Sequence, residues 1–121
     1  MVEATRSQYK NLEVWKEAMD LVVGVYEVAC QLPPEEKYGL ADQMRRAAVS
    51  IPSNIAEGQR RATTKETLHF CSIALGSAAE LETQLELAHR LYRIEVSKCE
   101  ARCLSVVKML YGLSNGLKRS L

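Results

Sequence analysis

Apolar residues recur every three or four positions through most of this chain, and no other feature limits its fold as strongly. The period runs through residues 12–31, 40–58, 64–92 and 97–119. The third stretch shows it most fully, with Leu68, Cys71, Leu75, Ala78, Leu81, Leu85 and Ala88. This spacing places the apolar side chains on one face of an α-helix, whereas a strand would need strict alternation. The sequence therefore predicts four amphipathic helices.

Local signals mark the ends of these helices. Pro33 and Pro34 end the first helix, because the residue before a proline is pushed out of the helical region and proline has no N–H to donate. Asn11 is the predicted N-cap of that helix, and Gly58 is expected to close the second in a left-handed conformation. Capping boxes predict the starts of the third and fourth helices at Thr63–Glu66 and Ser97–Glu100.

Pro52 falls inside the period of the second helix, where a proline typically costs about 3 kcal/mol. Ile55 keeps the apolar stripe of Ile51 in phase, which favours one helix kinked at Pro52 over two helices that break at Ser50. The hydroxyls of Ser50 and Ser53 are placed to bond carbonyls that the proline frees. Four helices with short connectors predict an all-α, up-down-up-down four-helix bundle with a Pro-kinked second helix.

The length of 121 residues allows one domain, with residues 1–10 as a flexible N-terminus. The longest uncharged apolar run, residues 21–26, is far shorter than the ~20 residues of a membrane span. No secretory signal is visible at the N-terminus, so we expect a cytoplasmic protein without membrane contact. The four cysteines, at positions 30, 71, 99 and 103, then read as reduced, small buried hydrophobes.

The sequence contains few residues that could form a catalytic site. His69 and His89 are the two histidines, and twenty residues of helix would separate them by about 30 Å. Cys99 and Cys103 are one turn apart but occupy core positions and lack a nearby histidine. We expect no enzyme, no metal site and no cofactor.

Polar residues gather in the segment Gln43 to Arg61. One stripe of the helix carries Arg46, Ser50, Ser53 and Glu57, with Asn54 beside it. This stripe suits either an RNA- or phosphate-contacting surface or a structural brace within or between subunits. We favour the brace. The predicted structural and assembly motif comprises Arg45, Arg46, Ser50, Pro52, Asn54, Glu57, Gly58 and Glu80.

Glu80 follows a cluster of small residues on the third helix and is predicted to pair with Arg45 or Arg46, the alternative being an exposed or functional acid. Glu86 and Arg90 have the spacing of a surface ion pair. Arg60, Arg61 and Lys65 are different, because they fall in and just after a polar turn where exposure is expected. These three are the predicted nucleic-acid contacts.

The chain resembles a bacterial family of 23S rRNA intervening-sequence proteins. The resemblance rests on Leu12–Trp15, Tyr38–Leu40, the run from Gln43 to Gly58, Gly76-Ser77 and Glu80–Glu82. It implies a cytosolic four-helix bundle that assembles into a ring, a homopentamer, and it implies no catalytic residues. Some members are encoded within intervening sequences of large-subunit rRNA genes, which suggests RNA as a partner by analogy.

Two hypotheses from different classes follow. In the first, a homo-oligomeric ring brings together several copies of the basic turn and of the basic residues of the fourth helix, and it binds RNA despite a net charge of only +1 per chain. In the second, the ring is an adaptor for a protein partner. The first helix favours assembly in both, because its apolar face is wider than one bundle core requires, although a helix deep in its own bundle would show the same pattern.

Overall fold

The computed structural model describes residues 8–121, and in this part of the chain the regular structure is helical. A short 3-10 helix η1 (Gln8–Asn11) precedes α2 (Glu13–Ala29), and a second, η2 (Pro34–Glu36), lies before α3 (Leu40–Gln59). The chain continues with α4 (Thr64–Tyr92) and α5 (Ser97–Lys118). The predicted all-α class and its four helices are confirmed. Of the N-terminal segment expected to be flexible, residues 1–7 lie outside the described part, and residues 8–10 belong to η1.

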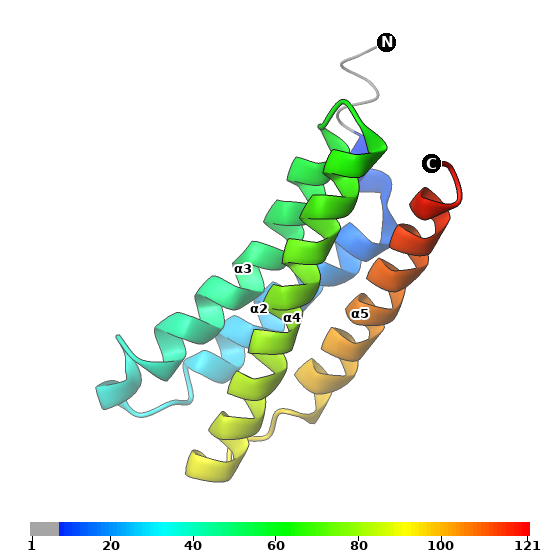
Figure 1. Cartoon of the computed structure of the whole chain (residues 1–121). Coiled ribbons are helices and arrows are strands. Elements are labelled where there is room, and N and C mark those ends of the chain that lie inside the picture. The colour runs from blue at the N-terminus through cyan, green and yellow to red at the C-terminus, as the bar shows by residue number, and fades with distance from the viewer. Residues whose placement is uncertain (1–7) are drawn as a thin grey trace.

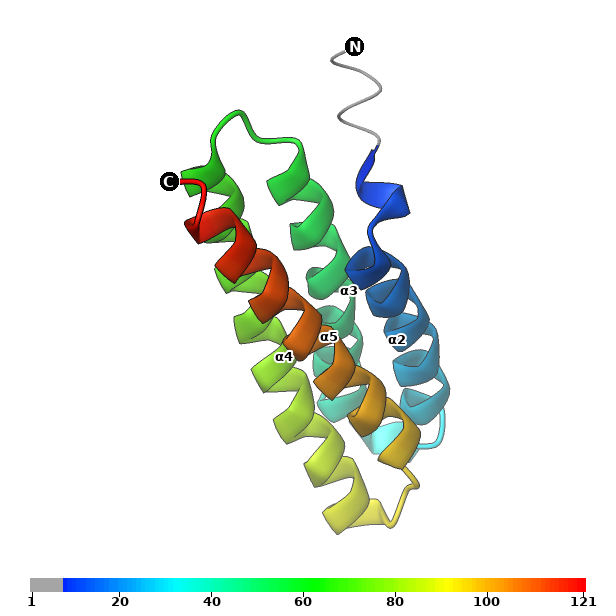
Figure 2. The ribbon, with the colours of Figure 1, turned by 90° about the vertical axis from the view of Figure 1, so that its right-hand side faces the viewer.

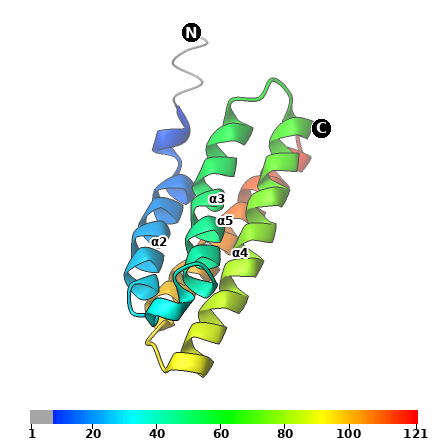
Figure 3. The same ribbon diagram turned by 90° about the vertical axis from the view of Figure 1, so that its left-hand side faces the viewer.

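The four long helices pack as a bundle, each running opposite to the one before it (Figure 1). Helix α2 contacts α3 and α5, and α4 contacts the same two helices. Figures 2 and 3 show that η1, the α3–α4 turn and the end of α5 lie at one end of the bundle. The α2–α3 and α4–α5 connections lie at the other. Among the described residues no helix has the length and apolar content needed to cross a membrane.

The core is built from the predicted apolar stripes. Seven large side chains are almost completely shielded from solvent, and burying each contributes about 1.5–3 kcal/mol. They are Leu21, Met44, Ile51, Ile55, Leu81, Leu85 and Leu110.

Helix α3 continues through Pro52, which is buried within it, so the alternative of two helices broken at Ser50 is not adopted. The bend expected at Pro52 stays a prediction. The Ser50 hydroxyl does not bond a freed carbonyl as expected but lies 2.7 Å from the Ser77 hydroxyl of α4. Asn54 Nδ2 donates to the Ser50 carbonyl at 2.8 Å and to the Ser50 hydroxyl at 3.0 Å.

Gly58 does not have the role predicted for it. The helix continues to Gln59, and no glycine in the described chain has a positive φ. Gly58 instead allows α3 and α4 to approach closely: a Cβ there would lie 3.0 Å from the Cβ of Phe70. Its carbonyl accepts a hydrogen bond from the Thr67 hydroxyl at 2.8 Å. A glycine near a helix end suits a left-handed cap or a close contact equally well, and here the contact determines its place.

Thr63 caps α4 as predicted, but the capping box is only half formed, because the Glu66 carboxylate bonds the Thr63 hydroxyl and not its backbone N–H. The Glu66 N–H donates to Thr63 Oγ1 at 3.2 Å, and the Thr63 hydroxyl donates to Glu66 Oε1 at 2.9 Å. The box predicted at the start of α5 is wrong, because Ser97 lies inside that helix and its N–H donates to Glu95 Oε1 at 2.9 Å. Asn11 belongs to η1 and is not the N-cap of α2.

Candidate nucleic-acid interface

Arg60, Arg61 and Lys65 lie where α3 passes into α4, and all three are exposed. The antiparallel packing of α3 on α4 makes this turn one end of the bundle (Figure 1). The hydrogen bond from the Thr67 hydroxyl to the Gly58 carbonyl joins the two helices next to the turn and so fixes the shape of the turn. The three predicted contacts are therefore brought together on a well-defined surface.

Aromatic rings support both arginines. The guanidinium carbon of Arg61 lies 4.8 Å from the centre of the Phe70 ring, and that of Arg60 lies 5.3 Å from the Tyr9 ring of η1. Arg61 also pairs with Glu57 Oε2 at 2.6 Å, and the expected role of Glu57 in a brace within or between subunits stays a prediction. Stacking on rings orders a guanidinium while leaving most of its N–H donors free for phosphate.

Three further cations share this end of the bundle, and we call the six together the basic pole. Lys10 belongs to η1, while Lys118 ends α5 and Arg119 follows it. The segments 8–11, 57–66 and 118–121 carry six basic side chains against two acidic ones, although the whole chain has a net charge of only +1. Sequence reasoning counted the basic residues of the fourth helix toward the assembled ring but missed Lys10, because no local spacing links η1 to the turn; the topology of the bundle does. The basic pole comprises Lys10, Arg60, Arg61, Lys65, Lys118 and Arg119.

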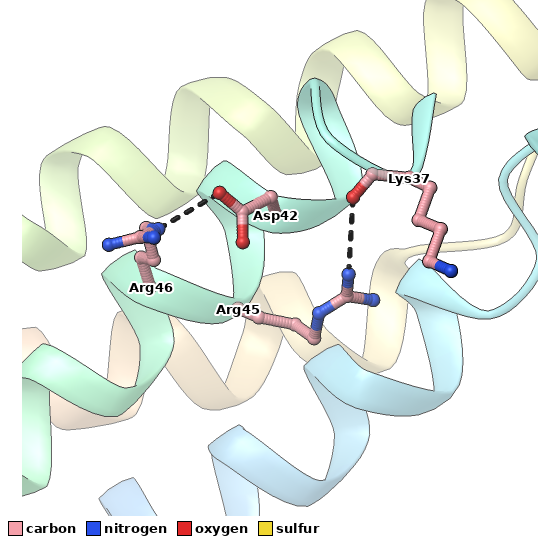
Figure 4. A network of polar contacts seen from close by, with 4 residues as sticks. All are labelled: Lys37, Asp42, Arg45 and Arg46. Carbon is pink, nitrogen blue, oxygen red and sulfur yellow. Dashed lines mark hydrogen bonds and ion pairs between the residues drawn. The ribbon is translucent and has the colours of Figure 1, made fainter. Parts of the chain in front are cut away.

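The arginines in the middle of α3 point in different directions (Figure 4). Arg46 Nε donates to Asp42 Oδ2 at 2.9 Å on its own helix. Arg45 reaches toward α2, where its guanidinium carbon lies 5.8 Å from the Tyr26 ring and Nη2 donates to the Lys37 carbonyl at 3.4 Å. The predicted pairing of either arginine with Glu80 is wrong within this chain.

A polar groove of about 250 Å³ lies between α3 and α4, beside the Ser50–Ser77 hydroxyl pair. Glu80 and Gln84 line its α4 side, and Glu80 is exposed with no ion pair among residues 8–121. Gln84 is 8% exposed, and its Oε1 is buried without a hydrogen-bond partner in the described structure. A buried acceptor without a donor is unfavourable, and native proteins rarely leave one unsatisfied.

A larger hollow of about 650 Å³ lies between α2 and α5. Its lining carries Glu17, Asp20, Glu27 and Glu95, and Arg102 bridges the first two at 3.3 and 3.6 Å. The excess of carboxylates gives this hollow the wrong sign for a phosphate ligand.

The cysteines provide no reactive thiolate in the core. Burial raises the pKa of Cys103 to about 12, and it also raises the pKa of Cys71 and of Cys99. These three fit the predicted role of small buried hydrophobes, but Cys30 is exposed at the end of α2, so the prediction is wrong there. Within residues 8–121 no three metal-ligating side chains of His, Cys, Asp or Glu come together.

Glu36 and Tyr92 form a further closely hydrogen-bonded site, at the end of the bundle opposite the basic pole. The Tyr92 hydroxyl donates to Glu36 Oε2 at 2.6 Å, and Glu36 Oε1 accepts from the Leu40 N–H at 3.0 Å. The hydrogen bond from Tyr92 lowers the pKa of Glu36, and the same bond raises the pKa of Tyr92. This site ties the start of α3 to the end of α4.

The model of the 23S rRNA-intervening sequence protein family matches residues 10–112. The chain belongs to this family. The match includes all of α2, α3 and α4 and most of α5. It thus covers the polar groove and the basic turn, and it confirms the resemblance read from the sequence.

Among solved structures, the chain is similar to a protein of unknown function from the S23 ribosomal protein family of Bacteroides thetaiotaomicron. The TM-score is 0.75 at 21% sequence identity, and the match covers 84% of this chain and 97% of that one. At this identity the likeness shows a shared fold. No curated protein matches the chain.

Proposed function

We propose that this family member is a non-enzymatic, RNA-associated protein of the cytoplasm that works as a homo-oligomeric ring, a pentamer, and contacts RNA through its basic pole. The observation that carries the proposal is the convergence of cations from η1, the α3–α4 turn and the end of α5. The family description, which refers to 23S rRNA intervening sequences, adds weight to RNA as the ligand. No catalytic step is part of the proposal.

The chemistry of the pole suits a phosphate backbone with unpaired bases. Lys65 and the two arginines supply charge, and arginine forks pair with phosphate oxygens. The rings of Tyr9 and Phe70 lie under the guanidinium groups, in the combination of cation and aromatic ring that single-stranded RNA sites use. Repetition of the pole around a ring would multiply a weak single contact.

An apolar face on α2 and α3 supports self-assembly. Met19 and Tyr26 lie seven residues apart on one side of α2 and are 42% and 43% exposed. Val49 of α3 is 41% exposed and lies one turn from Arg45, whose guanidinium rests over Tyr26. Exposed apolar side chains that cluster across two helices are typical of a surface covered by another subunit. We call Met19, Tyr26 and Val49 the apolar face.

The proposal includes a bend of α3 at Pro52. The proline ring cannot accommodate straight helical packing against the carbonyl four residues earlier. A bend would set the direction in which the last turns of α3 carry Arg60 and Arg61 toward a ligand.

The test is RNA binding by fluorescence anisotropy across a salt series. The wild-type protein is compared with a variant carrying alanine at Arg60, Arg61 and Lys65. Loss of three phosphate contacts predicts a weaker affinity and a salt slope shallower by about 2–3, since each contact contributes roughly 0.7–0.9. A matched control with alanine at Lys37, Arg90 and Lys98 removes the same charge at the opposite end of the bundle and should bind as the wild type.

Equal losses in the two triple variants would contradict an RNA site at the basic pole and leave only general charge attraction. Failure of the wild-type protein to bind structured or single-stranded RNA at low salt would overturn the RNA function itself.

The second candidate function is a protein adaptor, favoured by the acidic hollow between α2 and α5. A pull-down from lysate with and without RNase separates the two functions. Partners that stay bound after RNase treatment support the adaptor, and partners that are lost support RNA.

A further inference from the structure

We propose that Arg45 of one copy enters the polar groove of a neighbouring copy and pairs there with Glu80, so that each groove is completed by a second chain. This inference rests on the proposed self-assembly. It assigns a ligand class, the guanidinium group, to a groove in which hydrogen-bond acceptors lack donors from the same chain.

The groove has acceptors that lack donors. Glu80 is exposed and makes no ion pair with any residue from 8 to 121. Gln84 lies one helical turn further along α4, and its buried Oε1 has no partner in the same part of the chain. A guanidinium group has five N–H donors in a planar fork, so one group can pair with the Glu80 carboxylate through two of them.

The nearest arginine of the same chain is already engaged. Arg46 also lines the groove, but its Nε donates to Asp42 at 2.9 Å, and Figure 4 shows the two side chains directed toward each other along α3. The groove therefore keeps an unpaired carboxylate next to a cation that is held by its own helix.

Arg45, in contrast, has hydrogen-bond donors that lack acceptors. Its guanidinium lies over the Tyr26 ring and makes one long hydrogen bond, to the Lys37 carbonyl, with no carboxylate partner among the described residues. It lies over Tyr26 and one turn from Val49, two of the three side chains of the apolar face. An arginine among exposed apolar side chains is the usual composition of an interface anchor.

The groove also has apolar neighbours. Ile73 and Leu87 lie seven residues before and after Glu80 on α4, which places all three on one side of that helix, and they are 38% and 40% exposed. Apolar contacts around a buried charge pair exclude water and strengthen it. The apolar face of one copy and these two side chains of the next would supply that surround.

The two surfaces are placed suitably for a closed ring. The apolar face lies over α2 and α3, and the groove lies between α3 and α4, so the two are adjacent sides of the bundle. Adjacent sides of a four-helix bundle meet at about a right angle, and a ring of four or five copies needs an angle of that order between its two contact surfaces. The net charge of only +1 per chain keeps the overall repulsion between copies small.

Charge reversal tests the pair. The oligomeric state of Arg45→Glu, Glu80→Arg and the double variant is measured by light scattering and native mass spectrometry over a dilution series. We expect each single variant to dissociate at a concentration at least tenfold higher than the wild type. The double variant should return to within about threefold of the wild type, because the pair is restored with its charges exchanged.

A second double variant, Arg46→Glu with Glu80→Arg, is the matched control. It exchanges the charges of Glu80 and of Arg46, the arginine that lines the same groove within one chain. We do not expect this variant to restore assembly. Rescue there but not with Arg45 would overturn the inference, and so would single variants that assemble like the wild type. Circular dichroism of each variant checks that the bundle is folded.

The result also separates this inference from the function on which it rests. A wild-type protein that stays monomeric at every concentration removes the proposed ring as well as the pair. A stable wild-type oligomer whose assembly is unchanged in all four variants removes the pair alone, and RNA binding is measured independently of both.

Discussion

The middle of α3 and the turn that follows it are both rich in arginine and polar side chains, yet they are organised differently. In the middle, Arg46 is held by a carboxylate one turn away, and Ser50 bonds Ser77 across the helix contact. In the turn, Arg60 and Arg61 rest on aromatic rings at the surface, and Arg61 also pairs with a carboxylate one turn before it. An ion pair along the helix is therefore common to both regions, and the comparison teaches that the difference lies elsewhere: the Ser50–Ser77 hydroxyl pair joins α3 to α4 in the first region, whereas the cations of the second gather at one end of the bundle.

The sharpest way to break this division is at Gly58, which separates the two regions. Replacement by valine places side-chain atoms against Phe70, where a Cβ alone would already lie at 3.0 Å, and should lower the free energy of unfolding by roughly 1–3 kcal/mol. Urea denaturation measures the change. Gly76→Ala is the control, because no atom lies within 4 Å of a Cβ there, and it should stabilise by about 0.5–1 kcal/mol. A valine variant as stable as the wild type would show that the close contact is unimportant.

Removal of the hydroxyl pair probes the brace itself. Ser77 is buried, so Ser77→Ala leaves Ser50 with Asn54 as its remaining side-chain partner and should lower the free energy of unfolding by about 1 kcal/mol. The change measured for Ser50→Ala with Ser77→Ala should be smaller than the sum of the two single changes, since both remove one interaction. Additive effects would contradict a direct bond between the two hydroxyls.

Alanine at Arg60, Arg61 and Lys65 should have a smaller effect on folding. The Arg61–Glu57 pair is well exposed, and such pairs contribute little, so we expect a loss of less than about 1 kcal/mol. Thermal melting measures it beside the RNA titrations. A large loss of stability would place these residues with the brace and weaken the contrast between the two regions.

The smallest effect is expected at the start of α3, from Tyr92→Phe. Because the pKa of Glu36 is lowered in the folded protein, its contribution is complete above its unfolded pKa, near 4.5, and is lost as pH falls through the folded pKa. The pKa of Tyr92 is raised, so its contribution is complete below about pH 10 and is lost as pH rises through the folded pKa. The stability difference between wild type and variant should therefore be greatest at intermediate pH. A difference independent of pH would contradict this assignment.

The fold was largely predictable from the sequence. Four helices follow from the apolar period, the start of α4 follows from Thr63 and Glu66, and the surface pair of Glu86 and Arg90 forms at 2.8 Å as its spacing predicts. These features depend on residues within one or two turns of each other. Short-range geometry is the part of a structure that spacing encodes most directly.

The wrong predictions concern residues that can choose between two hydrogen-bond or ion-pair partners. Arg46 has an acid one turn before it and another on a different helix, and it binds the nearer one, Asp42, leaving Glu80 unpaired in the described chain. The predicted Ser97–Glu100 capping box does not form, because the carboxylate of Glu95 accepts the hydrogen bond from the backbone N–H of Ser97. The basic pole was only partly predicted: the basic residues of the fourth helix were expected to join the turn in the assembled ring, but Lys10 meets the turn through the topology of the bundle and not through any local pattern.

The contrast between Cys30 and the three buried thiols offers a reporter that requires no engineering. A thiol-reactive dye added to the folded protein should modify Cys30 alone, since the other three are shielded and remain protonated at neutral pH. Cys30 follows α2 at the end of the bundle away from the basic pole, so a dye there does not obstruct the RNA site. Photobleaching steps of single particles would then count the copies in the assembly directly.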